Sequence, residues 1–237
     1  MTATPSLPAP GPWRRAVVAE VRHPHPRTAA LRLELPGRVP HLPGQHYVVR
    51  LTAEDGYAAA RSYSLASAPS DPLLELFVEE LDDGEVSPYL TEAVELGDEL
   101  EIRGPIGGWF VWDGQSPAVA VGGGTGVVPL VAMLRHARHL GTLDRLRLAV
   151  SARTLAELPY ADELAAGGAV VALSRQASAS GRSAGRLIAA ELAPLVVPDA
   201  TYFVCGSAAF ATGASDLLLE LGVDPTAVRV ERFGASG

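Results

Sequence analysis

The spacing of hydrophobic residues changes in the middle of the chain, near residue 114. Before this point, hydrophobic residues alternate with charged ones, as at 31–35, 74–79 and 99–103. A period of two is typical of strands that bury one face, and turn-forming pairs such as Pro43-Gly44 separate the runs. Residues 13–113 therefore predict an antiparallel β-barrel, interrupted by one short helix near 86–93.

After residue 114, short hydrophobic strands alternate with segments whose hydrophobic residues have helical spacing. Strands are expected at 117–121, 145–150, 169–173, 201–205 and 228–230, and helices after 126 and near 161–166, 187–192 and 208–221. This alternation predicts a parallel sheet with helices on both faces. We expect three parts, namely a flexible Pro- and Ala-rich segment at 1–12, a barrel domain at 13–113 and an α/β domain at 114–237.

Charge and cysteine content exclude several classes of protein. The formal net charge is −8, and residues 1–113 carry 9 basic and 17 acidic side chains, which argues against nucleic-acid binding. The single cysteine, Cys205, excludes an internal disulfide and a four-cysteine cluster, and the histidines show no metal-ligand spacing, so no metal is expected. With neither a signal-peptide pattern nor a run long enough to span a membrane, we expect a cytoplasmic protein.

A glycine-rich segment, Gly122-Gly123-Gly124-Thr125-Gly126, lies directly between an expected strand and an expected helix. Glycines let a phosphate approach the backbone, and a helix N-terminus offers free N–H groups. The segment lacks the pattern of an ATP-type phosphate loop and departs from G-x-G-x-x-G. A plain tight turn is the alternative, but the position after a strand favours a dinucleotide phosphate.

Other polar side chains lie where expected strands end. In Arg61-Ser62-Tyr63-Ser64, the Arg can pair with a pyrophosphate, the Tyr can stack on a flat ring, and a Ser can hydrogen-bond a ring nitrogen. Arg153 and Arg175 follow strands of the expected parallel sheet, where an Arg can hold the 2′-phosphate of NADP. An ordinary polar strand and solvated arginines are the alternatives. Arg182 has a less suitable position.

These motifs together resemble the ferredoxin–NADP reductase family of two-domain flavoenzymes, from about Trp13 to the end of the chain. The resemblance is carried, in order, by Pro43-Gly44-Gln45, Arg61-Ser62-Tyr63-Ser64, Gly84-Glu85-Val86-Ser87, Gly104-Pro105, Gly122–Gly126, Arg153, Ser174-Arg175, Gly185-Arg186, Cys205-Gly206 and Glu231-Arg232-Phe233-Gly234. It implies a Greek-key FAD-binding barrel followed by an NAD(P)-binding domain.

The resemblance also implies a role for each matching residue. On the flavin side, Arg61 is expected to bind the FAD pyrophosphate, Tyr63 to pack on the isoalloxazine and Ser64 to bond near its N5. The other flavin-side residues are Ser62, Gly84, Val86, Ser87 and Phe233. On the nicotinamide side, the expected ligands are Gly123, Gly124, Thr125, Gly126, Arg153, Ser174, Arg175, Arg186, Cys205 and Gly206. Ser64, Cys205 and Glu231 are the expected catalytic residues.

The function implied by the resemblance is hydride transfer from NADPH, or less favourably NADH, to FAD and then to a separate acceptor such as a ferredoxin or an oxygenase component. Ser174-Arg175 favours NADPH. The chain resembles the bacterial branch that runs past Glu-x-Phe, without a fused iron–sulfur domain or globin, and we expect a monomer. Two alternatives stay open: an NAD(P)H:flavin or quinone reductase without a protein partner, and a non-catalytic flavin-binding sensor or regulatory subunit.

Overall fold

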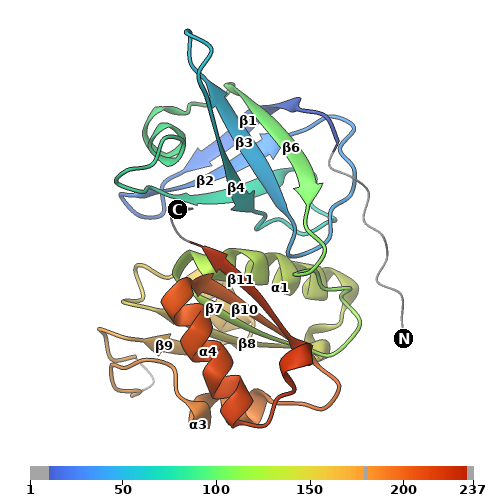
Figure 1. Ribbon diagram of the computed structural model, residues 1–237, viewed down its shortest axis with the longest axis vertical. Helices are drawn as coiled ribbons and strands as arrows, with labels where there is room; N and C mark the ends of the chain where they lie inside the picture. Colours follow the sequence, from blue (N-terminus) through green and yellow to red (C-terminus); the bar gives the residue numbers. More distant parts are fainter. Residues whose placement is uncertain (1–10, 179–180, 234–237) are drawn as a thin grey trace.

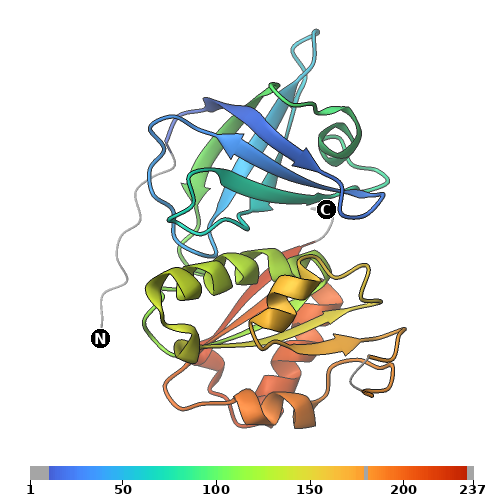
Figure 2. The same cartoon turned by 180° about the vertical axis from the view of Figure 1, so that it is seen from behind.

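The computed structural model describes residues 11–178 and 181–233. They form two sheets, one built from the first part of the chain and one from the second. Figure 1 shows the first sheet above the second, with helix α1 of the second unit lying at the junction; Figure 2 shows the same arrangement from behind. The expected flexible segment at 1–12 lies outside the described residues except for Gly11 and Pro12. The division into domains at 13–113 and 114–237 stays a prediction.

The first sheet is antiparallel and has the strand order β4-β3-β6-β1-β2-β5. Its strands are β1 (Arg14–Arg22), β2 (Thr28–Glu34), β3 (His46–Thr52), β4 (Ala58–Ser64), β5 (Leu74–Glu79) and β6 (Glu99–Ile106). A single bridge between Leu65 and Leu76 joins the two edges of the sheet, immediately after β4. The antiparallel barrel predicted from the period-two pattern is confirmed.

The second sheet is parallel and has the order β11-β10-β7-β8-β9. Its strands are β7 (Ala118–Gly123), β8 (Leu146–Ala152), β9 (Val170–Leu173), β10 (Thr201–Ser207) and β11 (Val228–Phe233). The helices are α1 (Val128–Leu140), α2 (Ala161–Ala166), α3 (Ala189–Leu192) and α4 (Ala208–Glu220). Side chains of α1 and α2 bury one face of this sheet, and side chains of α3 and α4 bury the other. The predicted α/β architecture is confirmed.

The helix expected near 86–93 is a short π-helical turn at Tyr89–Ala93 that begins after Pro88. Its Thr91 hydroxyl donates a hydrogen bond of 2.9 Å to the Ser87 carbonyl, and Leu90 is fully buried in the barrel. Between Gly123 and α1 the chain forms one 3₁₀ turn (Gly124–Val127), and α1 then begins at Val128, close to the expected start of the helix. Within the described ranges, no helix has the length and apolarity needed to cross a membrane.

The expectation that each barrel strand buries only one face is wrong for β5. Leu74, Leu76 and Val78 face the barrel core as predicted, but Glu75 and Phe77 on the other face are buried as well. Phe77 belongs to the hydrophobic cluster beneath α1, together with Ala30 and Ala66 of the barrel. The α/β domain therefore covers the outer face of β5, which the alternation of residues alone cannot reveal.

The barrel core supplies a direct test of the fold. Leu31 is fully buried among barrel side chains, whereas Leu96 lies in a loop with 73% of its surface exposed. We expect Leu31→Ala to lower the free energy of unfolding by about 2–5 kcal/mol, because it removes buried methyl groups and leaves a cavity. Leu96→Ala, the matched control, should change it by less than about 0.5 kcal/mol. Denaturant unfolding measures both, and equal effects would contradict the barrel packing.

Candidate functional site

A cleft of about 2220 Å³ lies between the two sheets and receives side chains from both. Its barrel wall contains Arg61, Ser62, Tyr63 and Ser64 of β4 and the turn that precedes the π-helix. Its α/β wall contains the glycine loop, the ends of β8, β9 and β11, and the start of α4. The structure thus brings the sequence-chosen residues together at one cleft, except Gly126, Cys205 and Gly206, which lie behind its surface.

The end of β4 presents three different chemical groups to the cleft. Arg61 is exposed and donates a hydrogen bond of 3.0 Å to the Glu85 carboxylate. Tyr63 pairs with Tyr47 of β3, and burial raises its pKa to about 12, so the phenol stays neutral. Ser64 is a buried residue that lines the cleft, and its hydroxyl makes no hydrogen bond to any part of the chain that the structure describes. This strand end offers a cation, a ring and a free hydroxyl.

The turn at 84–87 is held by its own side chains. The Ser87 hydroxyl accepts a hydrogen bond of 3.0 Å from the Leu81 backbone N–H. A Cβ on Gly84 would lie 2.4 Å from that hydroxyl oxygen, so a larger residue cannot fit without moving it. Val86 is fully buried in the barrel core, which fixes the turn against β5. The turn is therefore a rigid part of the barrel wall, beside Arg61.

The glycine loop is shaped by close packing against β10 and α4. A Cβ on Gly126 would lie 2.3 Å from the Cys205 carbonyl oxygen, and a Cβ on Gly123 would lie 2.5 Å from the Phe210 ring. Gly124 has a φ of 56°, a left-handed conformation that favours glycine, with open space on its Cβ side. Packing explains Gly123 and Gly126, whereas Gly124 and Thr125 line the cleft itself and remain available to a ligand.

Cationic side chains gather at the carboxyl ends of β8 and β9. Arg153, Arg175 and Arg186 are exposed and line the cleft together with Ser174. Only Arg153 has a carboxylate near it within the described ranges, Glu157 at 3.9 Å, and that pair is solvated. Arg182 instead donates hydrogen bonds to Glu191 and to the carbonyls of Ser183, Gly185 and Arg186, so it orders the adjoining loop.

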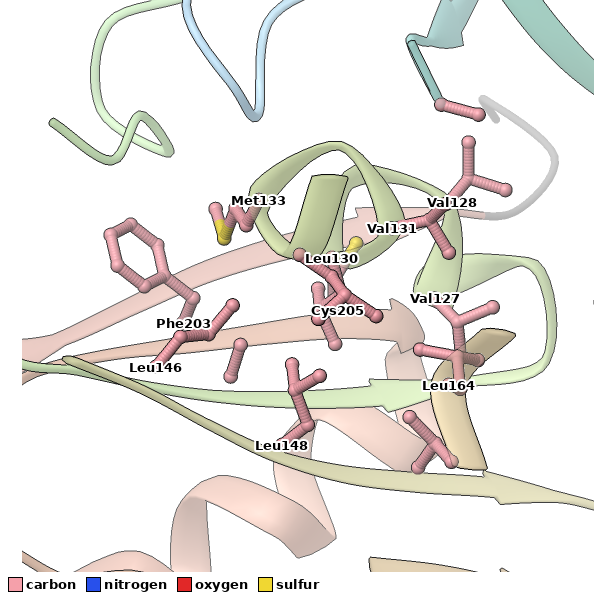
Figure 3. Close-up of a cluster of buried hydrophobic side chains, with 14 of the residues drawn as sticks. Val127, Val128, Leu130, Val131, Met133, Leu146, Leu148, Leu164, Phe203 and Cys205 are labelled. Carbon is pink, nitrogen blue, oxygen red and sulfur yellow. The ribbon is translucent and has the colours of Figure 1, made fainter. Parts of the chain in front are cut away.

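Cys205 and Glu231 lie side by side on β10 and β11. Cys205 is fully buried in the cluster beneath α1 (Figure 3), and burial together with the Glu231 charge raises its thiol pKa well above the usual range. Glu231 lines the cleft, and burial raises its carboxyl pKa to about 7. Its Oε2 atom is buried without a hydrogen-bond partner among the described residues. Cys205 is thus a neutral packing residue, and Glu231 is a carboxyl able to hold a proton near neutral pH.

His46 and Phe210 are two of the cleft residues that were not singled out from the sequence. His46 of β3 stands opposite Ser64 in the strand register, and burial lowers the pKa of its imidazole, so it is neutral. Phe210, in the first turn of α4, fills the space beside Gly123 and Gly206. A lone His in a strand and a Phe in an amphipathic helix carry no local signal, because only the tertiary fold brings them to the cleft.

The donor set fits a flavin on the barrel wall and a dinucleotide on the α/β wall. The unpaired Ser64 hydroxyl and the orphaned Glu231 Oε2 are polar groups in the cleft for which a ligand can supply partners. Exposed guanidinium groups on both walls suit pyrophosphate and phosphate oxygens. Neutral aromatic surface at Tyr63 and Phe233 suits a flat ring system.

The raised pKa of Glu231 predicts a specific pH dependence of stability. Between the ordinary value of 4.5 and the folded value of about 7, the folded protein binds more protons than the unfolded chain. The contribution of Glu231 to stability is therefore complete below the lower value and is lost as the pH rises through the upper one. The wild type should lose at most about 3 kcal/mol of its free energy of unfolding in this way. Glu231→Gln has no carboxyl to ionise there and should not show this loss. Denaturant unfolding of both proteins from pH 5 to pH 8 checks it; a constant difference would contradict the buried carboxyl.

Comparison with known proteins agrees with this geometry. Residues 16–111 match the family described as oxidoreductase FAD-binding domain. The flavohem-like FAD/NAD binding domain of nitric oxide dioxygenase from Vibrio cholerae superposes with a TM-score of 0.80 at 26% identity, over 93% of this chain and 98% of that one. The whole described architecture, and not the barrel alone, is therefore shared with a solved FAD/NAD-binding domain.

Two curated relatives are components of oxygenase systems. The reductase component of propane 2-monooxygenase from Mycolicibacterium goodii is 33% identical over 62% of this chain and 44% of its own length. The ferredoxin–NAD(P)⁺ reductase component of the naphthalene 1,2-dioxygenase/salicylate 5-hydroxylase systems of a Ralstonia species is 28% identical over 87% of this chain and 65% of its own length. The chain thus spans between under half and about two thirds of these relatives. It is an FAD- and NAD(P)-binding oxidoreductase domain of the ferredoxin–NADP reductase type.

Proposed function

We propose that this protein takes hydride from NADPH, in preference to NADH, onto an FAD held at the barrel wall and passes electrons to a separate redox protein of an oxygenase system. The observation that carries the proposal is the meeting of β4 and the glycine loop across one cleft. Hydride transfer requires two rings in contact, and two facing walls can provide this. The oxygenase partner rests on the relatives, which are themselves reductase components.

The residues of the barrel wall bind and orient the flavin in this proposal. We assign the FAD pyrophosphate to Arg61 and the turn at 84–87, and the flat ring to Tyr63. When bound, FAD supplies the ability to accept a hydride and to release electrons singly. The Ser64 hydroxyl, free of protein partners within the described ranges, donates a hydrogen bond to the ring. Glu231 holds or releases a proton nearby, since its pKa of about 7 allows either state.

The residues of the α/β wall bind the nicotinamide nucleotide. We assign its pyrophosphate to the backbone at Gly124 and Thr125, at the N-terminal end of the helical segment that continues into α1. Arg175 and Ser174 hold the 2′-phosphate, with Arg153 and Arg186 alongside. Cys205 acts from behind, by packing the sheet beneath the ring site, because its buried thiol does not line the cleft.

The first test is anaerobic mixing of the purified, FAD-loaded protein with NADPH and then with NADH. We expect NADPH to bleach the visible flavin absorbance quickly and NADH to bleach it more slowly. Subsequent addition of a one-electron acceptor protein should restore the oxidised spectrum. Bleaching without electron delivery to any protein acceptor would favour a flavin or quinone reductase. A yellow protein that neither nucleotide bleaches would overturn the reductase proposal and favour a sensor.

The assignment of Arg175 predicts a change in nucleotide selectivity. Arg175→Ala should weaken NADPH binding by about tenfold to a hundredfold, because a charge-assisted contact to a phosphate is lost. NADH, which has no 2′-phosphate, should bind almost as before. Arg145→Ala, which removes an exposed arginine outside the cleft, is the matched control and should affect neither. Titration of each nucleotide against flavin reduction measures the difference, and equal losses for both nucleotides would refute the assignment.

A further inference from the structure

Glu75 of β5 is the most deeply buried carboxylate among the residues that the structure describes, with 5% of its surface exposed. It lies where the barrel meets the α/β domain and does not line the cleft. Its Oε1 accepts hydrogen bonds from the Tyr160 hydroxyl at 2.7 Å and from Arg22 at 3.4 Å. Its Oε2 accepts one from Arg135 at 3.1 Å. A buried charge with this many partners is held in one orientation.

Arg135 connects the two domains through a single guanidinium. It lies on α1 and donates to Glu75 and, at 3.1 Å, to the Ala66 carbonyl, both in the barrel. Its other N–H groups reach Glu163 of α2 at 2.9–3.2 Å. Burial alone would lower the pKa of Arg135, but the hydrogen bonds to Glu163 and the charge of Glu75 outweigh it and raise the pKa. The side chain is therefore a permanent cation.

On the barrel side, this contact is tied directly to the strand that carries the flavin motif. Ser64 ends β4, Leu65 makes the bridge that closes the barrel, and Ala66 follows. The Ala66 N–H donates a hydrogen bond of 2.8 Å to the Glu75 carbonyl. The Ser67 hydroxyl accepts a hydrogen bond of 3.0 Å from the Glu75 N–H. Glu75 and the end of β4 thus form one hydrogen-bonded unit.

On the other side, the contact is tied to the glycine loop. The 3₁₀ turn Gly124–Val127 runs without a break into α1, and Arg135 lies two turns along that helix. A helix transmits displacement along its axis because its backbone hydrogen bonds make it stiff. Movement of Arg135 relative to Glu75 therefore moves the glycine loop relative to β4.

We propose that Glu75 and Arg135 are positioning residues that set the spacing of the two cofactor-binding walls, and with it the contact between the nicotinamide and flavin rings. The inference rests on the proposed function. Neither residue lines the cleft, so both act through the elements they join. Buried ion pairs commonly contribute little net stability compared with hydrophobic residues, whereas they can specify one arrangement of packed parts.

The test compares Glu75→Gln with Arg138→Gln in the FAD-loaded protein. The first substitution keeps a hydrogen-bond partner for Tyr160 but removes the charge that attracts Arg135. Arg138 is a matched control, since it lies on α1, one turn from Arg135, and binds Glu163, with no hydrogen bond or ion pair to the barrel among the described residues. We expect the limiting rate of flavin reduction at saturating NADPH to fall about tenfold or more in Glu75→Gln. The affinities for FAD and for NADPH should stay within about twofold, because all direct ligands remain.

A spectroscopic readout separates positioning from general weakening of the fold. Stacking of a nicotinamide on a flavin gives long-wavelength absorbance, which should weaken in Glu75→Gln and stay unchanged in Arg138→Gln. If Glu75→Gln does not fold, Arg135→Lys decides, because it keeps the charge but loses the fork that reaches Glu75, Ala66 and Glu163 together. If NADPH bleaches the wild type, and Glu75→Gln or, in its place, Arg135→Lys matches the wild type in reduction rate and in long-wavelength absorbance, the inference is overturned. A wild type that is not bleached would instead overturn the proposed function.

Discussion

The barrel and the α/β domain share one hydrophobic cluster, and the cleft between them depends on it. Ala30, Ala66 and Phe77 of the barrel pack in the same cluster as the underside of α1. Phe77 also contacts the Tyr160 ring, with 5.5 Å between ring centroids. This apolar contact supplies attraction but little direction. The hydrogen bonds of Glu75 and Arg135, set within it, supply the direction, and the two kinds of contact together hold the walls of the cleft.

The glycine loop serves two needs with the same residues. Gly123 and Gly126 allow β7, β10 and α4 to approach closely, as the short distances to Phe210 and Cys205 show. This packing places the backbone of Gly124 and Thr125 at the surface of the cleft. Packing therefore fixes the conformation of the loop, so the phosphate that we propose binds there would meet backbone groups already in place. A larger residue at Gly126 would collide with the backbone of β10, so it would disturb the packing of the sheet directly and any ligand at the loop only as a consequence.

The architecture could be predicted from the sequence because its signals are local. Period two marked the barrel, alternation of strand and helix marked the parallel sheet, and turn residues separated the elements. Some candidate site residues, such as Arg61, Arg153 and Arg175, were predicted from their position at strand ends, and the others from the family resemblance; their roles stay predictions. Glu75 could not be recognised, since a charged residue alternating with Leu74 and Leu76 looks like a solvent-facing position. Its burial depends on α1, which begins more than fifty residues later. His46 and Phe210 were missed for the same reason.

The arginines show why residue type alone does not assign a role. Arg153 and Arg175 follow the ends of β8 and β9, and Arg182 and Arg186 lie in the segment between β9 and α3. Arg182 is occupied, because it closes its own loop through Glu191 and three carbonyls, whereas the other three point their charge toward the cleft. The barrel side holds the excess of acidic residues, and the α/β half is neutral overall. In the proposed function, phosphate groups are therefore attracted more strongly to the α/β wall, and Arg61 is the one cation that β4 contributes to the barrel wall.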